Sequence, residues 1–333
     1  MILKMELPGE SYDIVIEKGC LLGAGEYLNL KRRVLVVTDT GVPEEYAQRV
    51  CDMADEGYIC RVEQGEQNKN LDTWQSILAA LSQNGFTRSD CVVAVGGGVI
   101  GDMAGFAAAC YMRGIDFYNI PTTLLSQIDS SIGGKTAVDF MGYKNIVGAF
   151  YQPKCVLIDT TLTRTLSRRQ RVNGIVEAVK MAATSSEQLF KIFETQNFDD
   201  CLDEIIVKSL EIKRDVVIND VREGGLRRIL NFGHTIGHAV ESMEGLSGLL
   251  HGECVALGML KMAKGEAKER IYRVLSALGL PLDKSFDKEQ IMKAIAHDKK
   301  AAGNDINLVF VDSIGSYRME KMSLDAFGAE MED

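Results

Sequence analysis

The stretch Cys91-Val-Val-Ala-Val-Gly-Gly-Gly-Val-Ile-Gly-Asp102 sets the fold expected for the first half of the chain. A short valine-rich run leads directly into glycines, which is typical of a buried parallel strand followed by a tight turn and a helix. Gly96, Gly98 and Gly101 fit the pattern G-x-G-x-x-G, in which backbone N–H groups hold a pyrophosphate at a helix N-terminus. The pattern predicts a phosphate-binding turn in a variant of the dinucleotide-binding fold, because at least one strand–helix–strand unit precedes it. A turn required only for close packing is the alternative.

Strands and helices alternate on both sides of this turn. We expect strands at 12–17, 33–39, 59–62, 91–95, 116–120 and 156–159, and helices at 44–55, 71–84 and 103–111. The alternation predicts an α/β class with a Rossmann-like nucleotide-binding domain over residues 1–160. Residues 127–136 are expected to form a flexible loop that delivers Lys135. Its Gly-Lys-Thr ending suggests a P-loop, but Asp129 stands where that motif requires glycine.

The second half shows helical periodicity from about Ser167. Helices are expected at 189–194, 202–218, 228–243, 254–268, 271–278 and 289–300, and a strand hairpin at 306–311 and 317–320. Residues 161–333 are therefore predicted to form a mostly α-helical domain. On an earlier helix of this half, Glu177 and Lys180 have the i, i+3 spacing that is typical of an exposed salt bridge.

Histidines are concentrated in this second half. His234, His238 and His251 are three of only four histidines in 333 residues. His234 and His238 have the i, i+4 spacing that places two side chains on one helix face, and His251 is expected in a loop that enters the next helix. This clustering predicts a divalent metal site. Ordinary polar residues on a half-buried helix are the alternative.

Composition limits the partners. The chain is 46% apolar and 25% charged, with a net charge of −10, so it lacks the basic field that nucleic acid or an anionic membrane attracts. An anionic ligand must therefore meet a local basic cluster. Eight cysteines occur without a Cys-x-x-Cys pair, and we find neither a signal peptide nor an apolar run near the ~18 residues needed to span a bilayer. We expect a cytoplasmic protein.

Together the motifs resemble the 3-dehydroquinate synthase family of sugar phosphate cyclases, which are related in fold to metal-dependent polyol dehydrogenases. The resemblance runs from about Asp39 to Gly315. It rests on the motifs at 96–102, 111–114, 121–125, 129–136, 144–145, 177–180, 227–241, 251–253 and 298–300. Departures from the family pattern are Ser167, Gln170, Val221 and Asp139, which stand where proline, glutamate, an acidic residue and asparagine are usual.

The resemblance implies a role for each motif. It implies that Glu177, His234 and His251 bind a divalent metal, Zn or Co, while His238 serves the substrate and its leaving phosphate. The NAD contacts that it implies are Asp39, Glu66, Lys69, Gly97, Gly98, Asp102, Thr122, Thr123, Lys135 and Lys144. The substrate contacts are Asp129, Lys135, Asn145, Lys180, Lys213, Arg227, Asn231, His238, Lys299 and Lys300, with Arg113 supplied by the partner subunit of a homodimer.

The reaction that the resemblance implies converts 3-deoxy-D-arabino-heptulosonate 7-phosphate to 3-dehydroquinate and phosphate, a step of aromatic amino acid biosynthesis through the shikimate pathway. Transient oxidation by NAD precedes β-elimination of phosphate, reduction, ring opening and aldol closure. The alternatives are a sister cyclase such as 2-deoxy-scyllo-inosose synthase, an NAD-dependent polyol dehydrogenase and a non-enzymatic binding module. The motifs at 133–136 and 227–238 favour the first function.

Overall fold

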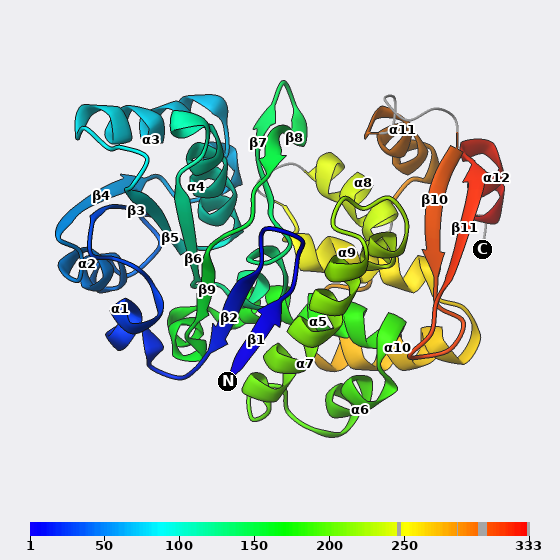
Figure 1. Ribbon diagram of the computed structural model, residues 1–333. Coiled ribbons are helices and arrows are strands. Elements are labelled where there is room, and N and C mark those ends of the chain that lie inside the picture. Colours follow the sequence, from blue (N-terminus) through cyan, green and yellow to red (C-terminus); the bar gives the residue numbers. More distant parts are fainter. Residues whose placement is uncertain (245–247, 285, 299–304, 332–333) are drawn as a thin grey trace. The chain divides into compact units, whose positions relative to one another are not determined.

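The computed structural model describes residues 1–244, 248–284, 286–298 and 305–331 (Figure 1). The chain divides into two compact units, Met1–Ser167 and Arg168–Asp333. Unit 1 contains a mainly parallel sheet and unit 2 is mostly helical, so the predicted fold class is confirmed. No helix in the described part of the chain is both long enough and apolar enough to cross a membrane.

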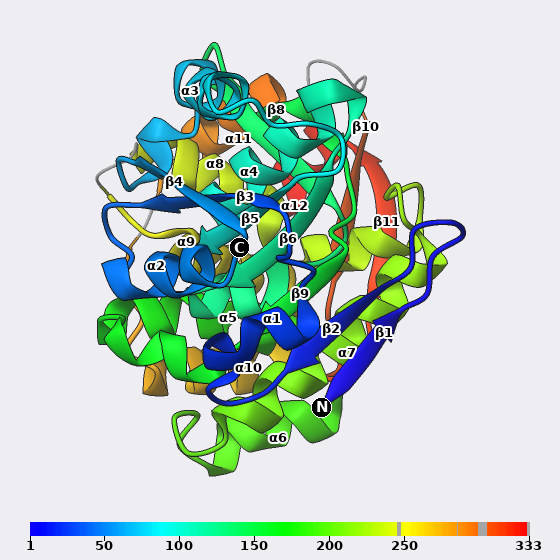
Figure 2. The ribbon, with the colours of Figure 1, turned by 60° about the vertical axis from the view of Figure 1, so that its left-hand side comes forward.

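A seven-stranded sheet in the order β1-β2-β9-β6-β5-β3-β4 forms the centre of unit 1 (Figure 2). Its strands are β1 (Ile2–Met5), β2 (Tyr12–Ile16), β3 (Arg33–Asp39), β4 (Glu56–Val62), β5 (Cys91–Gly96), β6 (Asp116–Pro121) and β9 (Cys155–Ile158). β1 pairs antiparallel with β2, and the other neighbours pair in parallel. Parallel pairing places the carboxyl ends of β3, β5 and β6 along one edge.

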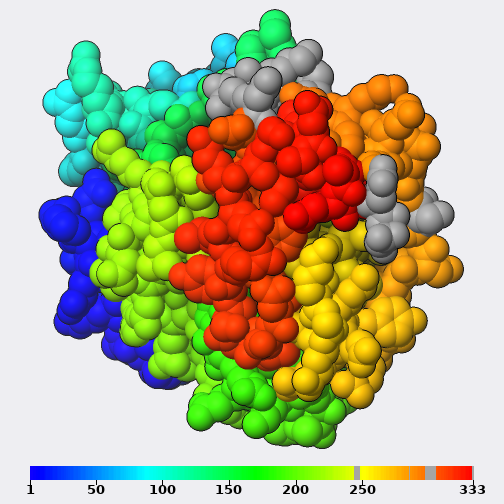
Figure 3. All heavy atoms as spheres, turned by 90° about the vertical axis from the view of Figure 1, so that its right-hand side faces the viewer, coloured from blue at the N-terminus to red at the C-terminus, as the bar shows by residue number. Residues whose placement is uncertain are grey.

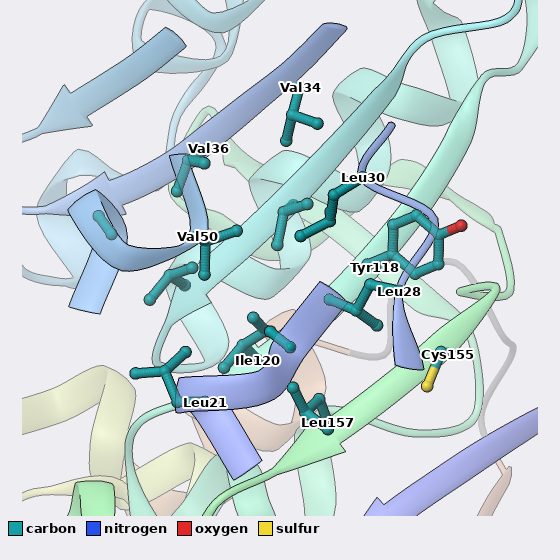
Figure 4. Packing of buried hydrophobic residues seen from close by; sticks show 14 of the residues in the cluster. Leu21, Leu28, Leu30, Val34, Val36, Val50, Tyr118, Ile120, Cys155 and Leu157 are labelled. Carbon is teal, nitrogen blue, oxygen red and sulfur yellow. The ribbon is translucent and has the colours of Figure 1, made fainter. Parts of the chain in front are cut away.

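Helices cover both faces of this sheet. They are α1 (Ala24–Tyr27), α2 (Glu44–Asp52), α3 (Leu71–Gln83) and α4 (Gly98–Cys110). Alternate residues of β3 enter two cores. Val34 and Val36 pack in one core with residues of α1 and α2, among them Val50 of α2 (Figure 4), whereas Leu35 and Val37 pack with residues of α3 and α4. Burial on both faces explains why β3 and β5 are continuous apolar runs without polar alternation.

Helix α4 begins at Gly98, five residues before the predicted start at Met103. Gly97 is extended, with φ −77° and ψ −169°, and the helix follows it at once. A Cβ atom at Gly98 would lie 3.0 Å from Ser130 Oγ, and one at Gly101 would lie 3.1 Å from Asn119 Nδ2. Most of the glycines expected to form a turn therefore lie in the helix. Glycine fits these positions because a larger side chain would press against the neighbouring residues.

Of the loop predicted at 127–136, only residues 131–134 lie outside helices and strands. Residues Ser126–Ser130 form a π-helix, and Lys135 begins an antiparallel hairpin of β7 (Lys135–Phe140) and β8 (Tyr143–Phe150). β8 is largely exposed, so it lacks the apolar alternation that identifies a strand in a sequence. A Cβ atom at Gly148 would lie 2.1 Å from the Thr136 carbonyl oxygen, so glycine there permits close strand pairing.

Unit 2 contains α5 (Arg168–Ser185), α6 (Glu187–Thr195), α7 (Leu202–Asn219), α8 (His234–Glu244), α9 (His251–Met262), α10 (Gly265–Ala277), α11 (Lys288–Asp298) and α12 (Leu324–Glu330). The predicted hairpin is present as β10 (Asp305–Phe310) and β11 (Arg318–Ser323), seen in red with α12 in Figure 3.

Two predicted helices of unit 2 are divided. The helix expected at 228–243 is a 3-10 helix, Leu226–Asn231, followed by α8, because Gly233 has a φ of 79° that ends the first segment. The helix expected at 254–268 ends at Met262, and α10 starts at Gly265, whose φ is 50°. His251, expected in a loop, is the first residue of α9.

Gly105 provides a test of packing in unit 1. A Cβ atom there would lie 2.5 Å from Thr136 Cγ2, between α4 and β7. We expect Gly105→Ala to lower the free energy of unfolding by about 1–3 kcal/mol through overpacking, measured by urea denaturation. Gly25→Ala is the control, because its nearest heavy atom is Met53 Sδ at 3.9 Å. Equal stability of the two variants would contradict this packing.

Candidate active site

Three possible metal ligands from separate helices meet in unit 2. Glu177 lies on α5, and His234 and His251 are the first residues of α8 and α9. The Nε2 atoms of His234 and His251 lie 3.6 and 3.5 Å from Glu177 Oε1. Ligand atoms in a tetrahedral zinc site, with bonds of about 2.0–2.2 Å, are roughly 3.3–3.6 Å apart. These three residues therefore fit a divalent metal.

The other nitrogen of each imidazole faces an acceptor. His251 Nδ1 lies 3.4 Å from Glu241 Oε2, and His234 Nδ1 lies 3.3 Å from the Phe232 carbonyl oxygen. A proton on each Nδ1 would satisfy these acceptors and leave the Nε2 lone pairs directed at Glu177. Such outer contacts commonly orient the histidine ligands of metals.

Glu177 and Lys180 form a buried ion pair, so the exposed salt bridge expected from their spacing was wrong. Their side chains are 0% and 2% exposed, and Lys180 Nζ contacts Glu177 Oε2. Lys180 also donates to the Leu230 carbonyl oxygen at 2.5 Å. Glu177 Oε1 accepts no hydrogen bond of normal geometry within the described residues. A buried carboxylate oxygen in that state is costly, and a cation would compensate it.

Charge shifts the pKa values of this cluster. Burial raises the pKa of Glu177, but Lys180 and the imidazoles hold it well below the usual range. Burial and Lys180 lower the pKa of His234. Burial also disfavours the charged form of His251, yet Glu177 and Glu241 raise its pKa to about 10. Without a metal, a proton on His251 thus supplies positive charge that a divalent cation would replace.

Glycines bring the three ligand helices together. A Cβ atom at Gly258 of α9 would lie 1.9 Å from the Gly233 carbonyl oxygen, just before α8. One at Gly252 would lie 2.2 Å from the Asn173 carbonyl oxygen on α5, and Gly252 N–H donates to Asn173 Oδ1 at 2.6 Å. Backbone contact without side chains thus fixes the spacing between Glu177 and the two histidines.

Several residues predicted to contact the substrate lie on or next to the 3-10 helix Leu226–Asn231. Arg227 is 3% exposed and donates through Nη1 to the Val221 carbonyl oxygen at 2.7 Å. Asn231 Nδ2 donates to Glu223 Oε1 at 2.6 Å. Lys213 is buried on α7, which packs against this helix. A cavity of about 390 Å³ is lined by Arg222, Glu223, Arg228, Asn231 and Asn307.

His238 lies next to the metal ligands. Its ring centroid is 5.1 Å from that of His234 and 5.8 Å from that of His251. His238, Glu241 and His251 also form a second group with ligand atoms within 4.8 Å of one another. Both the i, i+4 hypothesis and the division of roles therefore remain predictions, although Glu177, His234 and His251 form the more buried group.

The sequence reasoning missed three carboxylates of this site. Glu241 orients His251, and Glu223 binds Asn231. Asp220 accepts backbone N–H bonds from Gly224, Gly225 and Arg227 at 2.8, 2.7 and 3.0 Å. Glu241 could have been recognised one turn beyond His238, whereas Asp220 and Glu223 depend on loop contacts that spacing does not reveal.

In unit 1, several predicted NAD contacts gather at the carboxyl edge of the sheet. Asp39 ends β3, Gly97 follows β5, and Thr122 follows β6 and donates from its N–H to the Gly96 carbonyl oxygen at 2.9 Å. Asp39 Oδ1 accepts the Gly41 N–H at 2.8 Å, and burial raises its pKa. A Cβ atom at Gly97 would lie 2.9 Å from Thr123 Cγ2. The bare backbone at the start of α4 fits a pyrophosphate.

Lys69 joins residues from both predicted ligand sets. Its side chain is 5% exposed, and Nζ lies 2.6 Å from Asp102 Oδ2, 3.9 Å from Glu66 Oε1 and 2.5 Å from Asn145 Oδ1. Burial lowers the pKa of Lys69, but Asp102 and Glu66 outweigh that effect and raise it. The ammonium therefore remains charged.

The remaining predicted residues occupy separate positions. Asp129 lies in the π-helix, Lys135 begins β7 and Lys144 lies in β8. Arg113 ends a 3-10 helix with a φ of 67°. Lys299 and Lys300 lie outside the described residues.

Comparisons of the sequence with known proteins identify a single family. The family profiles for the 3-dehydroquinate synthase N-terminal and C-terminal regions match residues 59–173 and 174–301. A 3-dehydroquinate synthase of Streptococcus pneumoniae (strain ATCC 700669 / Spain 23F-1) is 40% identical, over 100% of this chain and 99% of the relative.

Solved structures are also similar. A 2-deoxy-scyllo-inosose synthase complexed with carbaglucose-6-phosphate, NAD+ and Co2+ has a TM-score of 0.89 at 25% identity and covers 99% of both chains. A 2-epi-5-epi-valiolone synthase from Streptomyces hygroscopicus subsp. jinggangensis 5008 with NAD+ and Zn2+ bound has a TM-score of 0.87 at 26% identity, covering 98% of this chain and 97% of that one.

Gly258 tests whether helix packing positions the metal ligands. Gly258→Ala would push α9 from the start of α8, so we expect metal affinity to fall by about 10–100-fold, as for other changes in outer contacts. Competition with a chromogenic chelator measures this. Gly328→Ala is the control, because its Cβ would lie 3.5 Å from Met292 Cε in another part of unit 2. Unchanged metal affinity in Gly258→Ala would contradict the role of this contact.

Proposed function

The chain belongs to the 3-dehydroquinate synthase family, and we propose that the residues gathered in its two units carry out the reaction of that family. The activity is that of a 3-dehydroquinate synthase, a phosphate lyase of the shikimate pathway. It converts 3-deoxy-D-arabino-heptulosonate 7-phosphate to 3-dehydroquinate and phosphate. The residue roles and the identity of the bound groups form the proposal.

The convergence of Glu177, His234 and His251 on one point is the observation that carries the proposal. Related structures contain NAD+ together with Co2+ or Zn2+. When bound, the metal would supply a Lewis acid for the substrate hydroxyls, and NAD a hydride acceptor that is regenerated within the cycle. Lys180 holds Glu177 ionised and occupies Oε2, so Oε1 remains directed at the imidazoles.

Cationic side chains meet the charges of the substrate. Arg227, Lys213 and Lys135 would bind its phosphate and carboxylate, which require a local basic cluster in a chain with a net charge of −10. Asn231 and His238 would orient the leaving phosphate. Because that phosphate is itself a base, it can take the neighbouring proton during elimination, and the protein needs positioning groups more than a strong base.

Unit 1 would bind the cofactor at the carboxyl edge of its sheet. The bare backbone at Gly97 and Gly98 would hold the pyrophosphate, and Asp39, Thr122 and Thr123 lie close to that edge in sequence and fold. Glu66, Lys69, Asp102, Lys135 and Lys144 complete the proposed NAD set. We further propose a cytoplasmic homodimer in which Arg113 serves the partner subunit.

A phosphate-release assay tests the function. With a divalent metal and trace NAD, we expect the purified protein to release phosphate from the heptulosonate substrate without net NADH, because the hydride is returned in each cycle. Chelation of the metal should abolish release, and added Zn2+ or Co2+ should restore it. Stoichiometric NADH would indicate a polyol dehydrogenase instead. Phosphate release from glucose 6-phosphate alone would indicate a sister cyclase.

Paired variants separate the metal ligands from the substrate residues. We expect Glu177→Gln and His251→Ala to lose bound metal and activity together. His238→Ala should retain metal while activity falls by about 100-fold or more, because it loses a positioned donor to the leaving phosphate. Metal content by atomic emission and phosphate release are measured on the same samples. Loss of metal in His238→Ala, with metal retained in Glu177→Gln, would restore the i, i+4 histidine pair as ligands.

A further inference from the structure

Lys69 stands at the centre of a polar cluster in unit 1 that joins three segments of the chain. The 3-10 helix Glu66–Asn68 precedes it, α4 carries Asp102, and the β7–β8 hairpin carries Asn145. We propose that Lys69 is a positioning residue that anchors the tip of this hairpin and thereby sets the conformation of Asn145.

The side chain of Lys69 is largely committed inside the protein. It is buried, with Nζ 2.6 Å from Asp102 Oδ2 and 2.5 Å from Asn145 Oδ1. An ammonium group has three N–H donors. Asp102 and Asn145 use two of them, and Glu66 Oε1 lies 3.9 Å from the same nitrogen. The charge of Lys69 is thus balanced mainly by its own neighbours, Asp102 and Glu66.

The backbone of Lys69 holds the same hairpin at a second point. Its carbonyl oxygen accepts the Asp139 N–H at 2.8 Å, and Asn70 forms a parallel bridge with Asp139. Asp139 Oδ1 in turn accepts the Asn145 N–H at 2.8 Å. The side chain of Asn145 is therefore bound by Lys69. Its backbone N–H is bound by Asp139, which the backbone of Lys69 holds in turn.

The backbone of Asn145 has an uncommon conformation. Its φ is 53°, in the left-handed region, which asparagine adopts more readily than most non-glycine residues but which is still a minor conformation that its contacts favour. The hairpin tip offers little apolar packing in its place, because Met141 and Ile146 are 81% and 59% exposed. The hairpin base differs, since β7 packs on α4 near Gly105. The polar contacts of Lys69 and Asp139 therefore help to order the tip at Asn145, together with the pairing of Phe140 with Tyr143.

This arrangement has a consequence for catalysis that rests on the proposed function. Asn145 belongs to the proposed substrate contacts, and Lys69 to the proposed NAD contacts. A change at Lys69 should therefore weaken substrate binding even when the cofactor is saturating, because it releases Asn145 from its bound conformation.

Hydrogen exchange of the ligand-free protein tests the anchor directly. In Lys69→Met we expect the amides of 139–146 to exchange roughly tenfold faster or more, since a hydrogen bond to a charged group is lost. The β5 amides should keep their wild-type rates. Lys31→Met, at an exposed lysine whose Nζ lies 3.5 Å from the Met53 carbonyl oxygen, is the control and should leave the hairpin unchanged. Wild-type exchange at 139–146 in Lys69→Met would overturn the proposal.

Two variants at Asp139 provide an independent test if Lys69→Met does not fold. Asp139→Asn retains an oxygen that accepts the Asn145 N–H, and Asp139→Ala removes it. We expect faster exchange at Asn145 in Asp139→Ala and near wild-type exchange in Asp139→Asn. Equal exchange in the two variants would overturn the proposed support of Asn145.

Kinetics then separate positioning from cofactor binding. With NAD saturating, Lys69→Met and Asn145→Ala should each raise the KM for the heptulosonate substrate, and the double variant should match Asn145→Ala. Independent, multiplying effects on KM would overturn the proposal. Failure of the proposed function would appear separately, as absence of phosphate release in the wild-type protein, and the exchange experiments would still decide the role of Lys69.

Discussion

The buried ion pair between Glu177 and Lys180 is the interaction on which the candidate metal site depends. A carboxylate without solvent contact is unfavourable by several kcal/mol unless opposite charge and hydrogen bonds compensate it. Lys180 compensates one oxygen and is itself fixed by the Leu230 carbonyl group. The second oxygen faces two imidazoles, and a divalent cation is the group that would satisfy all three. The same lysine therefore links the metal ligands to the 3-10 helix that carries Arg227 and Asn231.

Close backbone packing between helices holds the three candidate metal ligands in a defined geometry. His234 and His251 begin their helices, and Gly233 and Gly258 let the start of α8 approach the backbone of α9 closely. Gly252 binds α9 to α5 in the same way. Ligands placed on three packed helices are held more rigidly than ligands on loops, as precise coordination requires. Glycines have a similar role in unit 1, where Gly97 and Gly98 leave the backbone at the start of α4 without side chains.

Sequence patterns predicted the parts of the fold that depend on continuous burial. β3 was predicted at its observed bounds and β5 to within one residue, because buried parallel strands are unbroken apolar runs. The β7–β8 hairpin was missed because β8 is largely exposed and lacks the apolar alternation that identifies a strand in a sequence. The i, i+3 spacing of Glu177 and Lys180 suggested a surface pair, since spacing does not report the helices that bury it. The glycine-rich window and clustered histidines identified the candidate sites, and Glu241 lies one turn beyond His238, whereas Glu223 and Asp220 become visible only through tertiary contacts.

X-ray absorption spectroscopy of the cobalt-loaded wild-type protein would test the central claim most directly, because it counts the imidazole and oxygen ligands around the ion. Glu177, His234 and His251 predict two imidazoles and at least one oxygen in the first coordination shell. Three imidazoles would place His238 on the metal beside His234 and contradict the division of the two histidines between metal and substrate. A shell without imidazole would contradict the site itself.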